Sequence, residues 1–150
     1  MKISKVRIVL DTNVILAYTR TKSEDSPNKE IICRWGEGQF DVLWSRDVLN
    51  EYINKMKFFR ISEDTIIKIL SHFIQFGKAV EIKFYHYDIY PEDAKDICFV
   101  LCALNGYGSH IITYDSHLLD LAEEYIRKFS IIILKPVPFL QELRKLLKET

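Results

Sequence analysis

The chain has 150 residues, of which 48% are hydrophobic and 28% charged, a composition that excludes a disordered chain and predicts one domain spanning residues 1–150. Its 21 Lys and Arg residues balance 21 Asp and Glu residues, so global electrostatic attraction to nucleic acids is not expected. No signal peptide opens the chain and no apolar run reaches the roughly 18 residues of a membrane span, so we expect a cytoplasmic protein.

Apolar runs separated by turn residues predict strands that alternate with helices. In chain order we expect a strand at 6–10, a helix at 12–18, a loop at 19–28, a helix at 29–35, a strand at 40–44, a helix capped by Ser45, a helix at 62–76, a strand at 80–84, a loop at 85–93, a helix at 94–104, a strand at 110–113, a helix at 116–125, a strand at 131–134 and a helix at 139–147. This alternation predicts an α/β fold, a three-layer α/β/α sandwich around a central, mainly parallel sheet.

Four acids, Asp11, Glu51, Asp96 and Asp115, stand where a strand gives way to a helix or within the first turns of that helix. Because the carboxyl ends of parallel strands gather at one edge of a sheet, acids far apart in sequence are expected to converge there. Neighbouring carboxylates need a counter-charge, and a hard divalent cation such as Mg²⁺ or Mn²⁺ supplies it. The alternative for each acid taken singly is a helix cap or compensation of the helix dipole. For Asp96 that alternative is weaker, since Asp93 is the better N-cap.

The four acids stand in four characteristic segments: Asp11-Thr12-Asn13-Val14, Ser45 through Glu51-Tyr52, Asp96 ahead of Val100-Leu101-Cys102-Ala103-Leu104, and Thr113-Tyr114-Asp115-Ser116-His117-Leu118-Leu119. Together these segments resemble the PIN-domain ribonucleases, in the branch of VapC-like toxins from toxin–antitoxin pairs. The resemblance covers residues 6–147 and implies a PIN-like fold. Two departures are Tyr114, where relatives often have glycine, and Ile97 after Asp96, where many relatives have a second acid. The second departure leaves open whether Asp93 contributes.

The resemblance implies roles for particular residues. Asp11, Glu51, Asp96 and Asp115 would be both the catalytic residues and the ligands of one or two Mg²⁺ or Mn²⁺ ions. Polar residues at Asn13, Ser45 and Thr113 would contact the substrate. His117, two residues past Asp115, would reach a phosphate, with a plain surface role as the alternative. Basic residues after the first helix and after Glu51 are further candidates for phosphate contacts, against ordinary solvated charges: Arg20, Lys22, Lys55, Lys57 and Arg60.

The function that the resemblance implies is metal-dependent hydrolysis of phosphodiester bonds in single-stranded or structured RNA. The protein would be a homodimeric endoribonuclease toxin silenced by a small antitoxin. One alternative is a PIN-domain RNA-processing nuclease without an antitoxin. Another is a non-catalytic PIN-like scaffold that binds RNA or protein, which the presence of all four acids disfavours. An aspartyl-phosphate hydrolase would need Asp-x-Asp after the first strand, where this chain has Asp11-Thr12-Asn13.

Overall fold

A five-stranded parallel sheet forms the centre of the computed structural model, which describes residues 6–149. Its strands follow the spatial order β3-β2-β1-β4-β5. They are β1 (Arg7–Leu10), β2 (Asp41–Trp44), β3 (Lys78–Ala79), β4 (His110–Ile112) and β5 (Ile132–Leu134). From β1 the chain first builds towards one edge and then returns to add β4 and β5 on the other side. The order therefore reverses between β1 and β4, the place where α/β sheets of this kind bind ligands.

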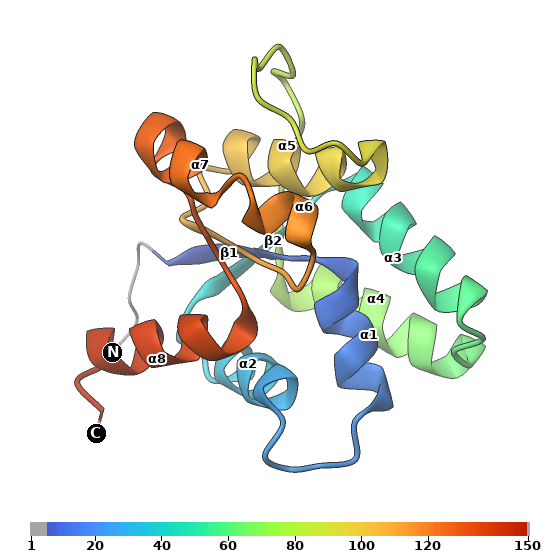
Figure 1. Cartoon of the computed structure of the whole chain (residues 1–150). Helices are drawn as coiled ribbons and strands as arrows, with labels where there is room; N and C mark the ends of the chain where they lie inside the picture. Colours follow the sequence, from blue (N-terminus) through green and yellow to red (C-terminus); the bar gives the residue numbers. More distant parts are fainter. Residues whose placement is uncertain (1–5, 150) are drawn as a thin grey trace.

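Helices cover both faces of the sheet, with α5 and α7 on one side and α2 and α8 on the other (Figure 1). This arrangement confirms the three-layer α/β/α prediction. The helices are α1 (Thr12–Arg20), α2 (Pro27–Gly36), α3 (Arg46–Phe58), α4 (Glu63–Phe76), α5 (Ile97–Asn105), α6 (Ser116–Leu119), α7 (Ala122–Phe129) and α8 (Pro136–Leu146), with the 3₁₀ turn η1 (Ala94–Asp96) ahead of α5. Within residues 6–149, no helix is both long and apolar enough to cross a membrane.

Tyr52 fixes helix α3 against the end of β1. Its side chain is fully buried, and its ring packs against Phe73 and Phe99 with centroids 5.1 and 6.1 Å away. Its hydroxyl donates a hydrogen bond to the carbonyl oxygen of Leu10, the last residue of β1. Since Glu51 precedes Tyr52 and Asp11 follows Leu10, this contact sets how far the two acids lie from each other.

The prediction of a strand at residues 80–84 is wrong. The edge strand β3 is shorter and earlier, and the ladder ends after the amide of Val80 donates to the carbonyl of Trp44. Beyond that point the amides of Lys83 and Phe84 donate to the Asn105 side-chain oxygen at 3.0 and 2.9 Å. The Asn105 amide in turn donates to the Phe84 carbonyl at 2.8 Å. The Asn105 side chain therefore forms the hydrogen bonds that a neighbouring strand would form if β3 were longer.

Three predicted helices differ in detail. The helix predicted at 116–125 is two helices, α6 and α7, because the amide of Leu121 bonds to the carbonyl three residues back and tightens the turn. The helix predicted at 94–104 opens with the 3₁₀ turn η1. The last helix begins at Pro136 instead of residue 139, since proline at the first helical position lacks only an amide that would be unpaired anyway. The capping role predicted for Ser45 is confirmed, because its side chain accepts a hydrogen bond from the Val48 amide.

Candidate active site

Asp11 is a buried carboxylate that no helix cap accounts for. It follows β1 directly, its amide donates to the carbonyl of Ile112 across the sheet at 2.9 Å, and only 3% of it is exposed. Its side chain makes no capping hydrogen bond to α1 but accepts one from the Thr113 hydroxyl at 2.6 Å. Burial raises the pKa of Asp11 to about 6, although the Thr113 hydrogen bond lowers it. The Asp11 carboxyl group is thus held at the end of β1, in surroundings that make its ionised form less favourable than in water.

Asp115 combines a capping role with a place in the acid cluster. Its Oδ1 accepts a hydrogen bond from the His117 amide at 3.0 Å, which caps the short helix α6. Its own amide donates to the Thr113 hydroxyl oxygen at 2.9 Å, and that hydroxyl donates to Asp11. Thr113 is fully buried. Thr113 therefore links Asp11 and Asp115 from inside the fold. It was predicted to contact substrate, and the structure shows it in contact with these two acids instead.

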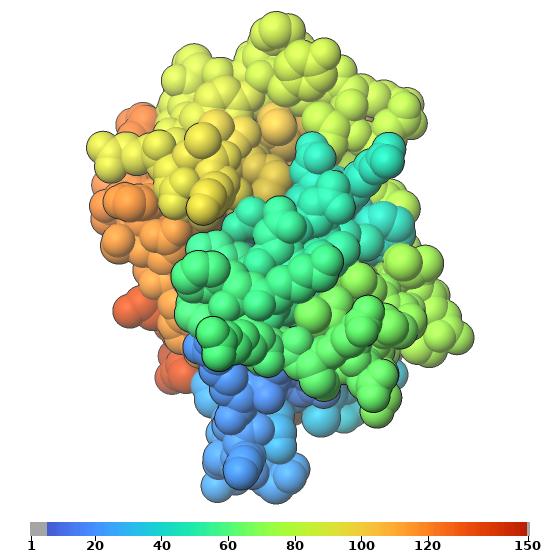
Figure 2. All heavy atoms as spheres, turned by 90° about the vertical axis from the view of Figure 1, so that its right-hand side faces the viewer, coloured from blue at the N-terminus to red at the C-terminus, as the bar shows by residue number. Residues whose placement is uncertain are grey.

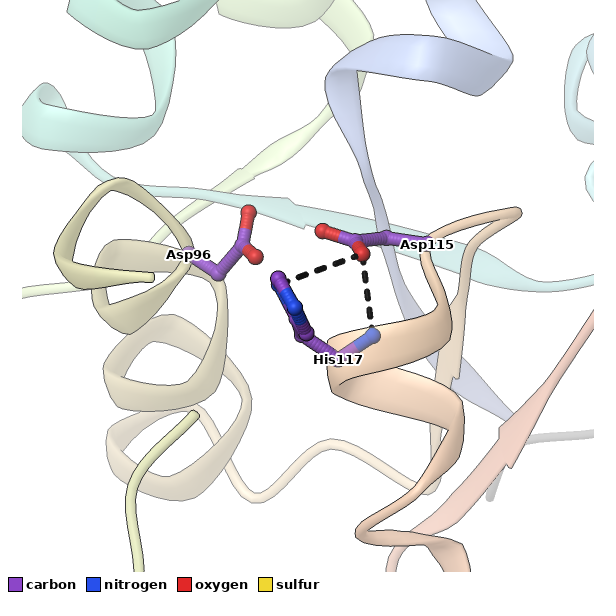
Figure 3. Close-up of side chains that lie close together, drawn as sticks. All are labelled: Asp96, Asp115 and His117. Carbon is purple, nitrogen blue, oxygen red and sulfur yellow. Dashed lines mark hydrogen bonds and ion pairs between the residues drawn. The ribbon is translucent and has the colours of Figure 1, made fainter. Parts of the chain in front are cut away.

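Asp96 is free of capping duty, as its position predicted, because Asp93 accepts the hydrogen bond from the Lys95 amide at 3.0 Å. Asp96 is 7% exposed, and its Oδ2 is buried without a hydrogen-bond partner among the described residues. The carboxyl groups of Asp96 and Asp115 come from separate elements and point towards each other (Figure 3). Burial, the hydrogen bond with Asp115 and the charge of Asp11 together raise the pKa of Asp96 to about 8. The same hydrogen bond lowers the pKa of Asp115, so Asp96 is the member of the pair that keeps its proton to higher pH.

His117 lies against this pair of acids. The ring Nδ1 is 3.8 Å from Oδ1 of Asp115, and Nε2 is 3.7 Å from Oε2 of Glu92. One candidate ligand atom each from Asp96, Asp115 and His117 all fall within 4.8 Å of one another, the spacing of a metal site. The sequence singled out His117 only for phosphate contact and did not single out Glu92 at all. His117 lies on α6 two residues after Asp115, whereas Glu92 comes from the loop before η1, and no local sequence pattern predicts that Glu92 lies beside His117.

Neither Asp11 nor Glu51 belongs to that group of three, whose candidate ligand atoms come from Asp96, Asp115 and His117. Glu51 is half-buried on α3, and its negative charge contributes to the raised pKa of Asp11. Burial raises the pKa of Glu51 itself, while the positive charges of Lys55 and Lys95 lower it. Glu51 is therefore close enough to Asp11 for its charge to raise the pKa of Asp11, while the charges that act on Glu51 itself are those of Lys55, Lys95 and Asp93.

The remaining predicted substrate contacts divide into an exposed and a buried residue. Asn13 is exposed on the first turn of α1, two residues after Asp11. Ser45 is 2% exposed and occupied as the cap of α3, so the structure gives it a role in holding the helix that carries Glu51. Tyr114, a departure from the family pattern, is 40% exposed and donates a hydrogen bond to the Asn28 side chain at 3.1 Å.

Comparison with known proteins places this arrangement in a family. Residues 7–117 match the family described as the PIN domain. The chain belongs to the PIN domain family. The fold is also similar to that in the crystal structure of VapBC2 from Rickettsia felis bound to a DNA fragment from their promoter. That match has a TM-score of 0.58 and 11% identity, and it covers 85% of this chain and 97% of that chain. No curated protein matches the sequence significantly.

The residues of this PIN domain suit a divalent cation. The side-chain oxygens of Asp11, Asp96 and Asp115 are the hard ligands that Mg²⁺ and Mn²⁺ prefer. The unpartnered, buried Oδ2 of Asp96 is an acceptor to which the described chain offers no donor. Burial and neighbouring negative charges raise the pKa values of Asp11 and Asp96, so ionised carboxylates are unfavourable there without a counter-charge. A divalent cation would supply that charge, so the donor set fits the metal chemistry expected of the site.

Proposed function

We propose that this PIN domain is a divalent-metal-dependent endoribonuclease that hydrolyses phosphodiester bonds of cytoplasmic RNA. The observation that carries the proposal is Asp96, whose buried carboxyl group faces that of Asp115 and keeps one oxygen without a partner. Membership of the PIN family supports hydrolysis of a phosphodiester as the reaction class. Asp11, Asp96 and Asp115 would hold one or two Mg²⁺ or Mn²⁺ ions, with Glu51 at the side of the cluster.

Each residue of the cluster has a distinct task in this proposal. A bound Mg²⁺ or Mn²⁺ would supply positive charge that offsets the phosphate and lowers the pKa of an attacking water. Thr113 holds the Asp11 carboxylate in place by donating to it at 2.6 Å. Glu51, half-buried and with its pKa raised by burial, would accept the proton of the attacking water. The products would be a 5′-phosphate and a 3′-hydroxyl, as the family resemblance implies.

Two residues near the cluster would contact RNA directly. His117 lies 3.8 Å from Asp115 and is exposed, so its ring would reach a phosphate at the mouth of the site. Asn13 is exposed two residues after Asp11 and would donate to the RNA backbone. Thr113 and Ser45 are buried and would act indirectly. Thr113 would hold the Asp11 carboxylate, and Ser45 would hold α3, the helix that carries Glu51.

We further propose that the protein is the toxin of a toxin–antitoxin pair and forms a homodimer. The resemblance to VapC-like toxins supports this, and so does the likeness in fold to VapBC2 of Rickettsia felis. A small antitoxin that places a basic side chain among the acids would displace the cation and stop the reaction. The test is growth after induced expression. An arrest that the Asp96→Asn variant does not cause supports a toxin, whereas unaffected growth by an active nuclease favours RNA processing without an antitoxin.

The experiment that tests the nuclease proposal uses purified protein and labelled single-stranded RNA with Mn²⁺, with Mg²⁺ and with EDTA. Cleavage should require metal, and Asp11→Asn and Asp96→Asn should each lose at least about 100-fold, because even residues that only support metal ligands contribute about 10–100-fold. Asp120→Asn is the matched control, since this exposed carboxylate lies at the other end of α6 from Asp115. Equal cleavage by the wild type and both site variants would overturn the assignment.

A further inference from the structure

A pocket of about 310 Å³ lies beside the acid cluster, between α3 and the turn η1. Its walls combine one acid of the site with two lysines, an amide and an aromatic ring: Glu51, Asn54, Lys55, Phe58 and Lys95. Four of these residues come from one face of α3, where positions three and four apart are neighbours. The fifth precedes Asp96 directly. The pocket therefore extends the site along α3 and shares Glu51 with it.

Two lysines against one acid, Glu51, give the lining of this pocket a net positive charge, whereas the chain as a whole is neutral. Both lie close enough to Glu51 for their charges to lower its pKa, against the larger effect of burial, which raises it. Among the described residues neither Lys55 nor Lys95 forms a salt bridge. Their ammonium groups therefore stay available to an anion that enters the pocket, and each stands next to an acid of the site.

Phe58 gives the pocket an open aromatic surface. Its side chain is 76% exposed, which is unusual for a phenylalanine on a well-formed helix. The ring rests edge-on against Phe59 with centroids 5.0 Å apart, and the guanidinium of Arg20 covers Phe59 at 4.4 Å. Phe58 is thus braced from one side and open on the other. α3 and the segment around η1 lie on the face that Figure 2 turns to the viewer, in green and yellow.

Lysines beside an exposed aromatic ring form a surface suited to binding single-stranded nucleic acids. The phosphates meet positive charge, and an unpaired base stacks on the ring whatever its identity. We propose that this pocket binds one nucleotide of single-stranded RNA next to the bond that is cut. Its base stacks on Phe58, its flanking phosphates contact Lys55 and Lys95, and Asn54 hydrogen-bonds to the base edge. This inference rests on the proposed ribonuclease function, and it makes an unpaired nucleotide a requirement for productive binding.

Binding measured without cleavage tests the proposal. The protein carries Asp11→Asn, Mn²⁺ is present, and fluorescence anisotropy reports the Kd for a labelled single-stranded RNA. Phe58→Ala should raise Kd about tenfold, the scale expected for loss of one stacked base. Phe58→Trp should retain tight binding, because a larger ring still stacks. Lys55→Ala and Lys95→Ala should each reduce the slope of log Kd against log salt by about 0.7, the value for one phosphate contact on a single strand.

Matched controls lie close by. Lys68→Ala removes an exposed lysine of α4 that does not line the pocket, and Phe76→Ala removes a 56% exposed ring on the same helix. Both should bind as the parent does. Wild-type affinity and salt slope in all three pocket variants would overturn the proposal, even if the protein cleaves RNA. Pocket variants that lose binding to single-stranded RNA in a protein without metal-dependent cleavage would uphold the subsite and overturn the proposed chemistry alone.

Discussion

Replacing Asp96 with asparagine tests whether crowding of carboxylates strains the metal-free fold. The carboxyl group is 7% exposed, and its pKa rises from the ordinary 3.8 to about 8 through burial, the hydrogen bond with Asp115 and the charge of Asp11. Between those two values the folded protein binds a proton that the unfolded chain has released. The stability of the metal-free wild type should therefore fall as the pH rises from about 4 to about 8. The raised pKa of Asp11 has the same sign.

The size of the effect follows from the same shift. A tenfold change in an acidity constant corresponds to about 1.4 kcal/mol, so ionising Asp96 in the fold costs at most about 6 kcal/mol. The hydrogen bond that lowers the pKa of Asp115 offsets part of this free-energy cost, and screening by water reduces it further. We therefore expect Asp96→Asn to be about 1–3 kcal/mol more stable than wild type at pH 8 in EDTA. For a chain of this size that is a rise in Tm of about 5 °C.

Thermal denaturation in EDTA at pH 4, 6 and 8 measures this directly. The gain of Asp96→Asn should be largest at pH 8 and small near pH 4, because at that pH Asp96 is protonated in the fold and close to its ordinary pKa of 3.8 in the unfolded chain. Asp120→Asn, which alters an exposed carboxylate at the far end of α6, should show no such trend. A variant that melts lower than wild type by the same amount at every pH would refute the reasoning, because it would make Asp96 a structural hydrogen-bonding group.

Three further changes test other parts of the site. Mn²⁺ should raise the Tm of the wild type and leave that of Asp96→Asn nearly unchanged, because only the intact cluster binds the ion in the folded state; an equal rise in both proteins would place the ion elsewhere. Thr113→Val removes the hydroxyl that donates to Asp11 at 2.6 Å, so the acid limb of the pH–rate profile should move to higher pH, whereas Thr113→Ser should keep the wild-type profile. Ser45→Ala removes the cap of α3 and should lower the free energy of unfolding in urea by about 1 kcal/mol, a loss that would be absent if the Val48 amide found another acceptor.

Much of the fold follows from patterns that the sequence carries locally. The three inner strands and the edge strand β5 are short, mainly apolar runs, and caps such as Ser45 mark where helices begin. The edge of the sheet was harder to predict, since residues 80–84 alternate as a strand does but hydrogen-bond to the Asn105 side chain. Such a contact joins segments about twenty positions apart, and no local pattern encodes it. That residues 1–150 form one domain stays a prediction.

The candidate site divides in the same way. Sequence position predicted Asp11 and Asp115 because they follow β1 and β4, whose ends meet where the strand order reverses, and it predicted Asp96 because this residue stands just before an apolar helix. It also identified Asp93 as the cap that leaves Asp96 free. It also placed His117 near Asp115, two residues away, but it could not reveal the lysine-lined pocket beside Glu51, because that pocket depends on how α3 packs beside the turn η1. The catalytic roles of the three acids stay predictions. The assignment of Glu51 as a ligand stays a prediction.

The central claim is that Asp11, Asp96 and Asp115 together form one catalytic metal site. Anomalous diffraction from crystals soaked in Mn²⁺, recorded at the manganese absorption edge, tests it most directly. The account predicts a strong peak within coordination distance of Asp11, Asp96 and Asp115, and no peak at that place in crystals of Asp96→Asn. An active protein whose only manganese peak lies away from these three carboxylates would contradict it.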